Sequence, residues 1–359
     1  MLSRIVKILL AVCILVNLCG CSLSKNNNTK YENSAQAGAT TAPGTAFKTT
    51  PLPPVSPGVT STPLPLAAVN LRFVVLADSR GTNNGINLPI VKKTFEKIKQ
   101  LLPQPGFAIM PGDLTDGSSS SSTVKSQLEY FKKTITGYYP ESFFYPGIGN
   151  HEVTSGIGGE QAFGQVFSGV QANFLDGYNG TVYYFDRGDT RFFMLNSDHP
   201  GEIHKVSDRQ LNWLKANIDP GKKHNLFFMH EPPYPTGPHV GSSLDVYKLQ
   251  RDELWDVIDS SNGPMVFCGH EHFYTRRHIN SDFNEKLQGM DFKFDKLVYQ
   301  VTVGSFGAPL YSGYKDKKDI DVLPISQYHF AVVDINGSSV KVSVYNVDGA
   351  LIDQFEQNS

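Results

Sequence analysis

Five short motifs, each placed where an apolar run ends, carry side chains that could bind metal ions. They read LADSR, GDLTD, GNHE, MHEP and GHEH along the chain. Together they contribute two carboxylates, one amide and three imidazoles: Asp78, Asp113, Asn150, His230, His270 and His272. Carboxylates combined with imidazoles suit Zn, Mn or Fe. Two such ions about 3.5–4 Å apart can hold the attacking and leaving oxygens of a phosphoryl displacement. The motifs therefore predict a two-metal site acting on phosphate esters.

The spacing within the motifs favours particular roles. His270 and His272 are two residues apart in an extended segment, so their side chains share one side and can meet neighbouring metals. Glu271 then points away, and we expect a surface or packing carboxylate. Asp113 follows Gly112, which permits a tight turn, and its two carboxylate oxygens could bridge two cations.

His151 follows Asn150 directly and cannot easily reach the same ion. We therefore expect it to act as the acid that protonates the leaving group. The alternative is a structural histidine of the loop. Further along, His239 lies in a Gly- and Pro-rich loop after His230 and is a candidate substrate contact.

Alternating strand and helix patterns position these motifs. Apolar runs that end in polar breaks predict strands at 70–78, 106–113, 141–152, 224–234 and 263–276. Amphipathic stretches predict helices at 87–102, 123–135, 207–218 and 244–258. Because sites form at the carboxyl ends of parallel strands, the five motifs are expected to converge.

The last part of the chain is rich in strands. Strands are expected at 296–305, 328–337, 339–347 and 350–355, with turns at Asn336-Gly337 and Asp348-Gly349. A hairpin is expected over 181–198. A mixed α/β beginning and a β-rich end indicate an α/β fold with two sheets packed face to face and helices outside. We expect one domain, 69–359.

The N-terminus is typical of an exported protein. Arg4 and Lys7 flank the start of an apolar stretch that runs to Cys19, which favours a signal peptide over a spanning helix. The stretch resembles a bacterial lipobox, with Cys21 as the lipidated residue. This predicts a signal peptide at 1–20 and attachment to the outer face of the cytoplasmic membrane. An uncleaved anchor and an ordinary secretion signal are the alternatives.

Composition narrows the other possibilities. Residues 21–68 are rich in Pro, Ser and Thr and predict an extended tether. The chain has 359 residues and a formal net charge of −2, so no basic field favours nucleic acid. Signal-peptide removal would leave Cys21 and Cys268 of the four cysteines. An acylated Cys21 cannot pair, so no disulfide is expected.

The motif set resembles the calcineurin-like metallophosphoesterase superfamily, and the stretches QLNWLK, CGHEHFYTR and YHFAVVDINGSSV are similar to its purple acid phosphatase-like branch. The resemblance implies a four-layer α/β/β/α double β-sandwich with two Fe, Mn or Zn ions. By resemblance, the first metal takes Asp78, Asp113 and His272. The second takes Asp113, Asn150, His230 and His270, with Asp113 bridging and His151 as the acid.

One position departs from the family pattern. Arg80 stands where the family usually has histidine, and a guanidinium has no lone pair to give a metal. The first metal could be bound weakly, leaving only one ion tightly held, or Asp116 could replace the missing ligand. Arg80 could instead bind substrate phosphate, or pair with Asp78 or Asp116.

Two functions follow from the sequence. The first is a lipid-anchored, metal-dependent hydrolase of small-molecule phosphomonoesters or phosphodiesters. The second, suggested by Arg80, is a catalytically weakened binding or envelope lipoprotein. Loops decide the substrate, so the motifs alone leave it open.

Overall fold

The computed structural model describes residues 71–358, which belong to one compact unit, Leu64–Ser359. The expected signal peptide, the lipidated Cys21, the tether at 21–68 and the predicted domain start at residue 69 all lie outside the described residues. Within 71–358, every helix is too short or too polar to cross a bilayer.

A six-stranded sheet contains both ends of the described chain. Its strand order is β16-β15-β14-β1-β4-β5. Strands β1, β4 and β5 are parallel, whereas β14, β15 and β16 extend the sheet as an antiparallel meander beside β1. The strands are β1 (Leu71–Val75), β4 (Ala108–Met110), β5 (Phe144–Pro146), β14 (His329–Asn336), β15 (Ser339–Asn346) and β16 (Leu351–Asn358).

An eight-stranded sheet lies against the first, in the order β13-β11-β12-β10-β9-β8-β7-β6. Its centre, β8-β9-β10-β12, is parallel, and the expected hairpin forms β7 and β8. The strands are β6 (Asn173–Phe174), β7 (Tyr183–Arg187), β8 (Thr190–Met194), β9 (His224–Met229), β10 (Met265–Cys268), β11 (Tyr274–Ile279), β12 (Val298–Val303) and β13 (Ile320–Ile325).

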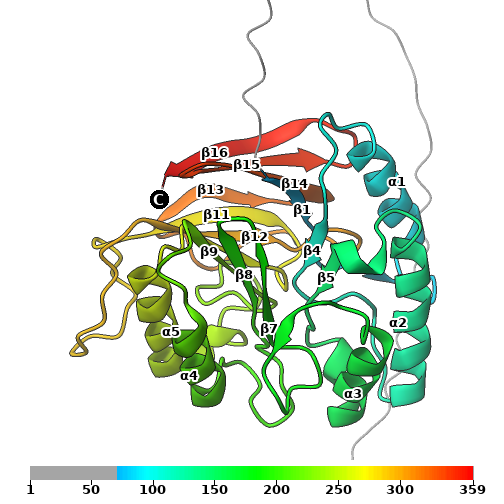
Figure 1. Ribbon diagram of the computed structural model, residues 1–359, viewed down its shortest axis with the longest axis horizontal. Helices are drawn as coiled ribbons and strands as arrows, with labels where there is room; N and C mark the ends of the chain where they lie inside the picture. The colour runs from blue at the N-terminus through cyan, green and yellow to red at the C-terminus, as the bar shows by residue number, and fades with distance from the viewer. Residues whose placement is uncertain (1–70, 359) are drawn as a thin grey trace, which may run out of the picture. The chain divides into compact units, whose positions relative to one another are not determined.

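Helices cover the outer faces of the two sheets (Figure 1). Buried residues of three helices pack with the six-stranded sheet: α1 (Leu88–Ile98), α2 (Ser121–Ile135) and α3 (Ile157–Val166). Two others pack against the eight-stranded sheet: α4 (Asp208–Asn217) and α5 (Lys248–Ser260). Short 3-10 turns occupy Glu141–Phe143, Glu152–Ser155 and Leu244–Val246, and a small hairpin joins β2 (Arg80–Gly81) to β3 (Gly85–Ile86).

Aromatic rings fill the space between the sheets. The Phe73 ring of β1 stacks on Phe107 at a centroid distance of 5.0 Å and meets the edge of Phe192 of β8 at 5.3 Å. Burying such rings is a large apolar contribution to the fold. The four-layer α/β/β/α double β-sandwich is therefore confirmed.

Local patterning missed two kinds of element. Helix α3 has three glycines or alanines in its first six residues and only a weakly amphipathic pattern, so glycine's low helix propensity hid it. Strand β13 is exposed at alternate positions at a sheet edge. Helix α2 begins at Ser121, two residues before the predicted start at 123.

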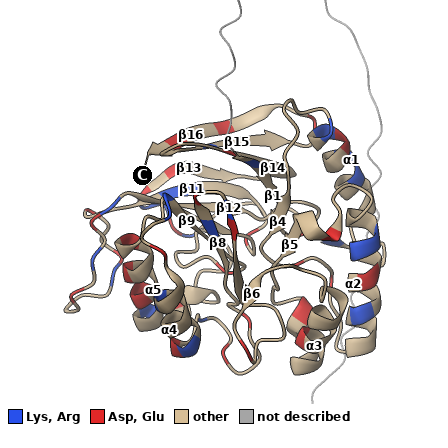
Figure 2. Cartoon of the chain, viewed as in Figure 1, with Lys and Arg blue, Asp and Glu red and all other residues tan. Residues whose placement is uncertain are grey.

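Acidic and basic residues are interspersed along the helices and loops (Figure 2). Not all of the helices' charges face solvent, since Glu160 of α3 and Arg251 and Asp252 of α5 are buried. The six candidate ligands lie outside the helices, in loops that follow strands.

Candidate metal centre

The candidate ligands come from both sheets. Asp78, Asp113 and Asn150 follow β1, β4 and β5, whereas His230, His270 and His272 follow β9 and β10. The backbone N–H of His270 donates to the Asp78 carboxylate at 3.1 Å, and that of Gly269 donates to the His230 carbonyl at 2.9 Å. The first bond joins the loops of the two sheets across the sandwich, and the second joins the loops after β9 and β10, so the motifs converge as expected.

Three of these residues have backbones in the left-handed region. The φ angles are 61° at Asp78, 50° at Asp113 and 68° at His270. Such values cost free energy for residues with a Cβ, and they persist where the surrounding structure enforces them. The strain therefore lies at the three residues that turn the chain out of its strands and into the site.

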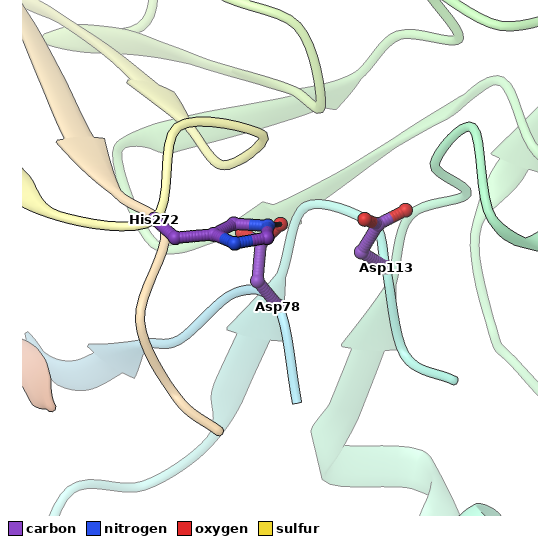
Figure 3. Close-up of side chains that lie close together, drawn as sticks. All are labelled: Asp78, Asp113 and His272. Carbon is purple, nitrogen blue, oxygen red and sulfur yellow. Dashed lines mark ion pairs between the residues drawn. The ribbon is translucent and has the colours of Figure 1, made fainter. Parts of the chain in front are cut away.

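Asp78, Asp113 and His272 form the first cluster (Figure 3). One ligand atom from each lies within 4.8 Å of the others, and all three residues are buried. The His272 Nε2 atom is 3.6 Å from Asp78 Oδ1. This is the set that the sequence assigns to the first metal.

A second cluster shares Asp113. His230 Nε2 lies 3.3 Å from Asp113 Oδ1 and 3.0 Å from Asn150 Oδ1. His270 Nδ1 lies 3.0 Å from the same amide oxygen and 3.2 Å from His230 Nε2. Tetrahedral ligands held at 2.0–2.2 Å from a metal stand roughly 3.3–3.6 Å apart. The four measured pairs are thus spaced like adjacent ligands of one ion.

Backbone carbonyls fix the orientation of the three imidazoles. His230 Nδ1 lies 3.1 Å from the Pro111 carbonyl, His270 Nε2 lies 3.2 Å from that of Ser242, and His272 Nδ1 lies 2.7 Å from that of Pro309. Each ring therefore donates one N–H to the backbone and turns the other nitrogen into the site. Metal-binding histidines are held in this way, because the second bond sets the tautomer.

The charges of the two clusters suit a cation. Burial, and then the Arg80 charge, lowers the pKa of His272 to about 3, and burial lowers the pKa of His270 well below its usual value. Neutral imidazoles are the form that binds metal. Burial, and then the Asp113 charge, raises the pKa of Asp78 well above its usual value. A cation at this place would relieve that cost, so the residues fit a metal centre.

His151 lies beside the centre with one nitrogen directed at it. Its Nδ1 donates to the Asp116 carbonyl at 2.7 Å, and its Nε2 is 3.8 Å from Asp113 Oδ2. The side chain is 24% exposed, so it can reach a leaving group in solvent. Its backbone N–H also donates to Asp113 Oδ1 at 3.1 Å. The geometry is compatible with the predicted acid.

Two residues of the motifs support the ligands without joining them. Glu152 is fully buried and accepts N–H bonds from Thr115 at 2.8 Å and Gly149 at 2.9 Å. It therefore links the second and third motifs. Burial raises its pKa to about 8. Gly112 has a φ of +90°, and a Cβ there would lie 2.5 Å from His230 Nδ1, so both the turn and the close packing require glycine.

Arg80 lies against the first cluster. Its Nη1 is 3.4 Å from Asp116 Oδ1, and its Nε is 4.0 Å from Asp113 Oδ2. The predicted ion pair with Asp116 is therefore present in the described structure. Asp116 is half exposed and turned to Arg80, and it is absent from the cluster of possible ligands found within 71–358. The structure thus gives no support to Asp116 as the missing ligand.

Two more residues shape the rim of the centre, and the sequence missed the first of them. Tyr311 stacks on the His272 ring at a centroid distance of 4.1 Å, and the Arg80 charge acts on its hydroxyl. Only its place in a long loop after β12 could have drawn attention to it. Of the two expectations for Glu271, the packing carboxylate is observed: Glu271 is fully buried and accepts the backbone N–H groups of Thr236 and Gly237. It holds the loop that carries His239.

A family model described as calcineurin-like phosphoesterase matches residues 71–274. The chain belongs to this family. The match contains all five motifs and ends at the start of β11, so it covers every candidate ligand. Membership supports a hydrolase and implies a metal centre at the place where the ligands converge.

Relatives share about a quarter of the sequence. An uncharacterized protein of Mycobacterium tuberculosis is 25% identical over 221 residues, which is 56% of this chain and 40% of the relative. A probable cyclic nucleotide phosphodiesterase of Rhodococcus erythropolis is 26% identical over 174 residues, 48% of this chain and 53% of the relative. A probable glycerophosphodiester phosphodiesterase of Arcobacter nitrofigilis is 26% identical over 181 residues, which is 49% of this chain and 59% of the relative. The chain thus spans about half the length of these relatives.

Solved structures share the fold at lower identity. A purple acid phosphatase from yellow lupin seeds has a TM-score of 0.64 and 17% identity, covering 80% of this chain and 53% of the lupin chain. GAP50, the anchor in the inner membrane complex of Plasmodium, has a TM-score of 0.54 and 14% identity, and the match covers 80% of this chain and 88% of the GAP50 chain. Both likenesses concern the double β-sandwich.

Proposed function

We propose that the protein is a metal-dependent phosphoesterase with a centre for two ions of Fe, Mn or Zn. The observation that carries the proposal is the second cluster: His230 lies 3.0–3.3 Å from ligand atoms of Asp113, Asn150 and His270, and His270 lies 3.0 Å from Asn150. Relatives named as probable phosphodiesterases support the reaction class.

Each ligand residue has a distinct part in the proposed reaction. Bound at the two clusters, the ions supply positive charge for the phosphoryl oxygens and lower the pKa of a water molecule toward neutrality. Asp113 belongs to both clusters and fixes their separation. The neutral imidazoles bind without adding charge, and their backbone anchors keep them in place before substrate arrives.

His151 provides the proton for the leaving group in this proposal. The bond from its Nδ1 to the Asp116 carbonyl fixes the ring, so a proton on Nε2 faces the centre. Transfer of that proton to the departing oxygen neutralises the developing alkoxide. His151→Gln should therefore slow the hydrolysis of esters with poor leaving groups, such as alkoxides, more than that of nitrophenyl esters.

We further propose that Cys21 carries a lipid and that the catalytic domain stands at the outer face of the cytoplasmic membrane. The apolar run before Cys21 and the Pro-rich composition of 21–68 support this location. Cys21→Ser should move the protein from the membrane fraction of cells to the medium or the precursor pool. An unchanged distribution would refute the anchor.

Turnover of aryl phosphates by the purified full-length chain tests the enzymatic proposal. We expect hydrolysis of p-nitrophenyl phosphate or its bis ester that depends on added Mn, Zn or Fe, and loss of at least 10²-fold in His230→Ala, since a missing ligand disrupts the ion. Absence of metal-stimulated turnover in the wild type would refute it.

The presence of Arg80 beside Asp113 favours a second candidate, a weakened binding or envelope lipoprotein. Here the fold would persist without catalysis. Metal analysis separates the two candidates: no bound metal, together with unchanged behaviour of His270→Ala, supports the second.

A further inference from the structure

Arg80 and Tyr311 border the metal centre together. The guanidinium lies 4.0 Å from Asp113 Oδ2, an oxygen of the carboxylate shared by both clusters. The Arg80 charge acts on the Tyr311 hydroxyl, and the Tyr311 ring covers the His272 imidazole. Arg80 thus pairs with Asp116 and interacts electrostatically with Tyr311 at the first cluster.

Contacts also connect Tyr311 to the second cluster. The Tyr311 hydroxyl lies 3.2 Å from His239 Nε2, and the His239 ring packs on His270 at a centroid distance of 3.9 Å. The backbone of the same loops is joined where Lys315 N–H donates to the Thr236 carbonyl at 2.8 Å. Two loops therefore close this side of the centre with polar groups.

Arg80 retains an unused donor. Its Nε is buried and has no hydrogen-bond partner among the described residues, although a buried donor without a partner costs free energy. Its side chain as a whole is 18% exposed, so Arg80 is partly accessible from solvent. An anionic oxygen of a ligand beside Asp113 could accept the hydrogen bond that the Arg80 Nε–H does not make to the protein.

The charge of the ligand follows from the position of Arg80. A neutral histidine at position 80 would leave the positive charge of the site to the metal ions alone. Arg80 adds a further full positive charge that persists at any physiological pH. A phosphomonoester carries about −1.5 to −2 at pH 7 and has three non-bridging oxygens. A phosphodiester carries a single negative charge and has two such oxygens. The additional donor therefore matches the additional oxygen and charge of a monoester.

We propose that Arg80 binds a non-bridging oxygen of a terminal phosphate, with Tyr311 as the positioning residue for its guanidinium, so that the protein prefers phosphomonoesters to phosphodiesters. The inference rests on the proposed phosphoesterase function and narrows its substrate class. It also sets this chain apart from the two relatives named as probable phosphodiesterases.

Paired kinetics on the full-length, metal-loaded protein test the preference. We expect the wild type to favour p-nitrophenyl phosphate over bis(p-nitrophenyl) phosphate at least tenfold in kcat/KM. Arg80→Gln should lower kcat/KM for the monoester by roughly 10–100-fold, as expected for a lost charge-assisted bond, and for the diester by less than threefold. Tyr311→Phe should lower the monoester value three- to tenfold because the ring stays and the hydroxyl is lost.

Arg72→Gln is the matched control. Arg72 lies at the start of β1, its side chain is 16% exposed, and it pairs with Asp334. Its replacement removes a guanidinium of similar exposure away from the strand ends that carry the ligands. The monoester-to-diester ratio should therefore stay at the wild-type value. Metal content is measured in each variant so that ratios are compared at equal occupancy.

Binding of inorganic phosphate distinguishes failure of this inference from failure of the proposed function. Phosphate affinity should fall at least tenfold in Arg80→Gln. If no ester is hydrolysed but this loss is seen, the Arg80 site stands and the phosphoesterase proposal fails. A diester preference in the wild type, equal losses on both esters, or unchanged phosphate affinity in Arg80→Gln would overturn the inference.

Discussion

At the scale of single residues, Arg80 decides how complete the first cluster is. It occupies the place of an imidazole ligand and puts a positive charge 4.0 Å from Asp113 Oδ2. Both effects oppose a cation held by Asp78, Asp113 and His272. Asp113, and with it the Arg80 charge, belongs to the second cluster too, but that cluster has four candidate ligands, a carboxylate, an amide and two imidazoles, against three in the first. The two sites should therefore differ in affinity.

Arg80→His should raise the affinity of the weaker metal site by at least tenfold, because it exchanges a repelling charge for a ligand. Metal content after dialysis against a weak chelator measures the change. Arg80→Ala is the control that removes the charge without adding a ligand. Equal metal content in wild type and Arg80→His would show that the site is complete without an imidazole at this position.

His329 makes the stability of the fold depend on pH. Its ring is fully buried in β14 with Nε2 unpaired, and burial lowers its pKa to about 4. The unfolded chain binds a proton near pH 6.5, whereas the folded chain binds it only near pH 4. Stability from the neutral ring is therefore fully present above pH 6.5 and is lost as the pH falls toward 4.

Replacing His329 with Gln should flatten this dependence. Across pH 6.5 to 4, we expect the free energy of unfolding of the wild type to fall by roughly 2–3 kcal/mol more than that of His329→Gln. Urea unfolding in the presence of chelator measures it without metal binding. The difference in the free energy of unfolding between the two proteins at pH 8 reports packing alone. If this free energy changes equally with pH in both proteins from pH 6.5 to 4, the role given to His329 is contradicted.

At the scale of elements, the loops after the strands form the site, and buried carboxylates hold those loops. Glu152 joins the loops after β4 and β5, whereas Glu271 joins the loop after β10 to the loop after β9. Neither could be assigned from spacing, since a glutamate beside a ligand has the same pattern whether it faces solvent or a neighbouring loop. Tertiary contact alone decides.

Glu271→Gln should loosen the loop from Thr236 to His239. The amide keeps the shape of the carboxylate but presents an NH2 group to a backbone N–H, which costs about 1–3 kcal/mol. We expect faster hydrogen exchange over 236–243 and weaker phosphate binding, with α2 unchanged. Glu129→Gln, on the exposed face of α2, is the control. Wild-type exchange over 236–243 in Glu271→Gln would contradict this role.

The sequence predicted the strands that carry ligands because each is a short apolar run ending in Gly or a polar residue. It missed α3, whose glycines weaken its helical pattern, and β13, an exposed edge strand. It also missed Tyr311, which reaches His272 through a loop without any periodic pattern. Residues that follow a strand could be predicted, whereas residues placed by long loops could not.

At the scale of the whole molecule, the sandwich brings the two sheets together at one end. The six-stranded sheet provides Asp78, Asp113 and Asn150, and the eight-stranded sheet provides the three histidines. An ion bound by both would link the sheets, and because the unfolded chain lacks the site, binding should stabilise the fold. The long-range pairing of β14 with β1 could not be assigned from local patterns, although the two-sheet architecture could.

Metal content of the purified full-length chain tests the central claim most directly. After loading with Mn or Zn, we predict at least one tightly bound equivalent and a second that is weaker. Asp113→Asn should lose both, since Asp113 is common to the two clusters, whereas Asp116→Asn, three residues along the same loop, should keep the tightly bound ion. A wild type without bound metal, or Asp113→Asn with an unchanged metal content, would contradict the account.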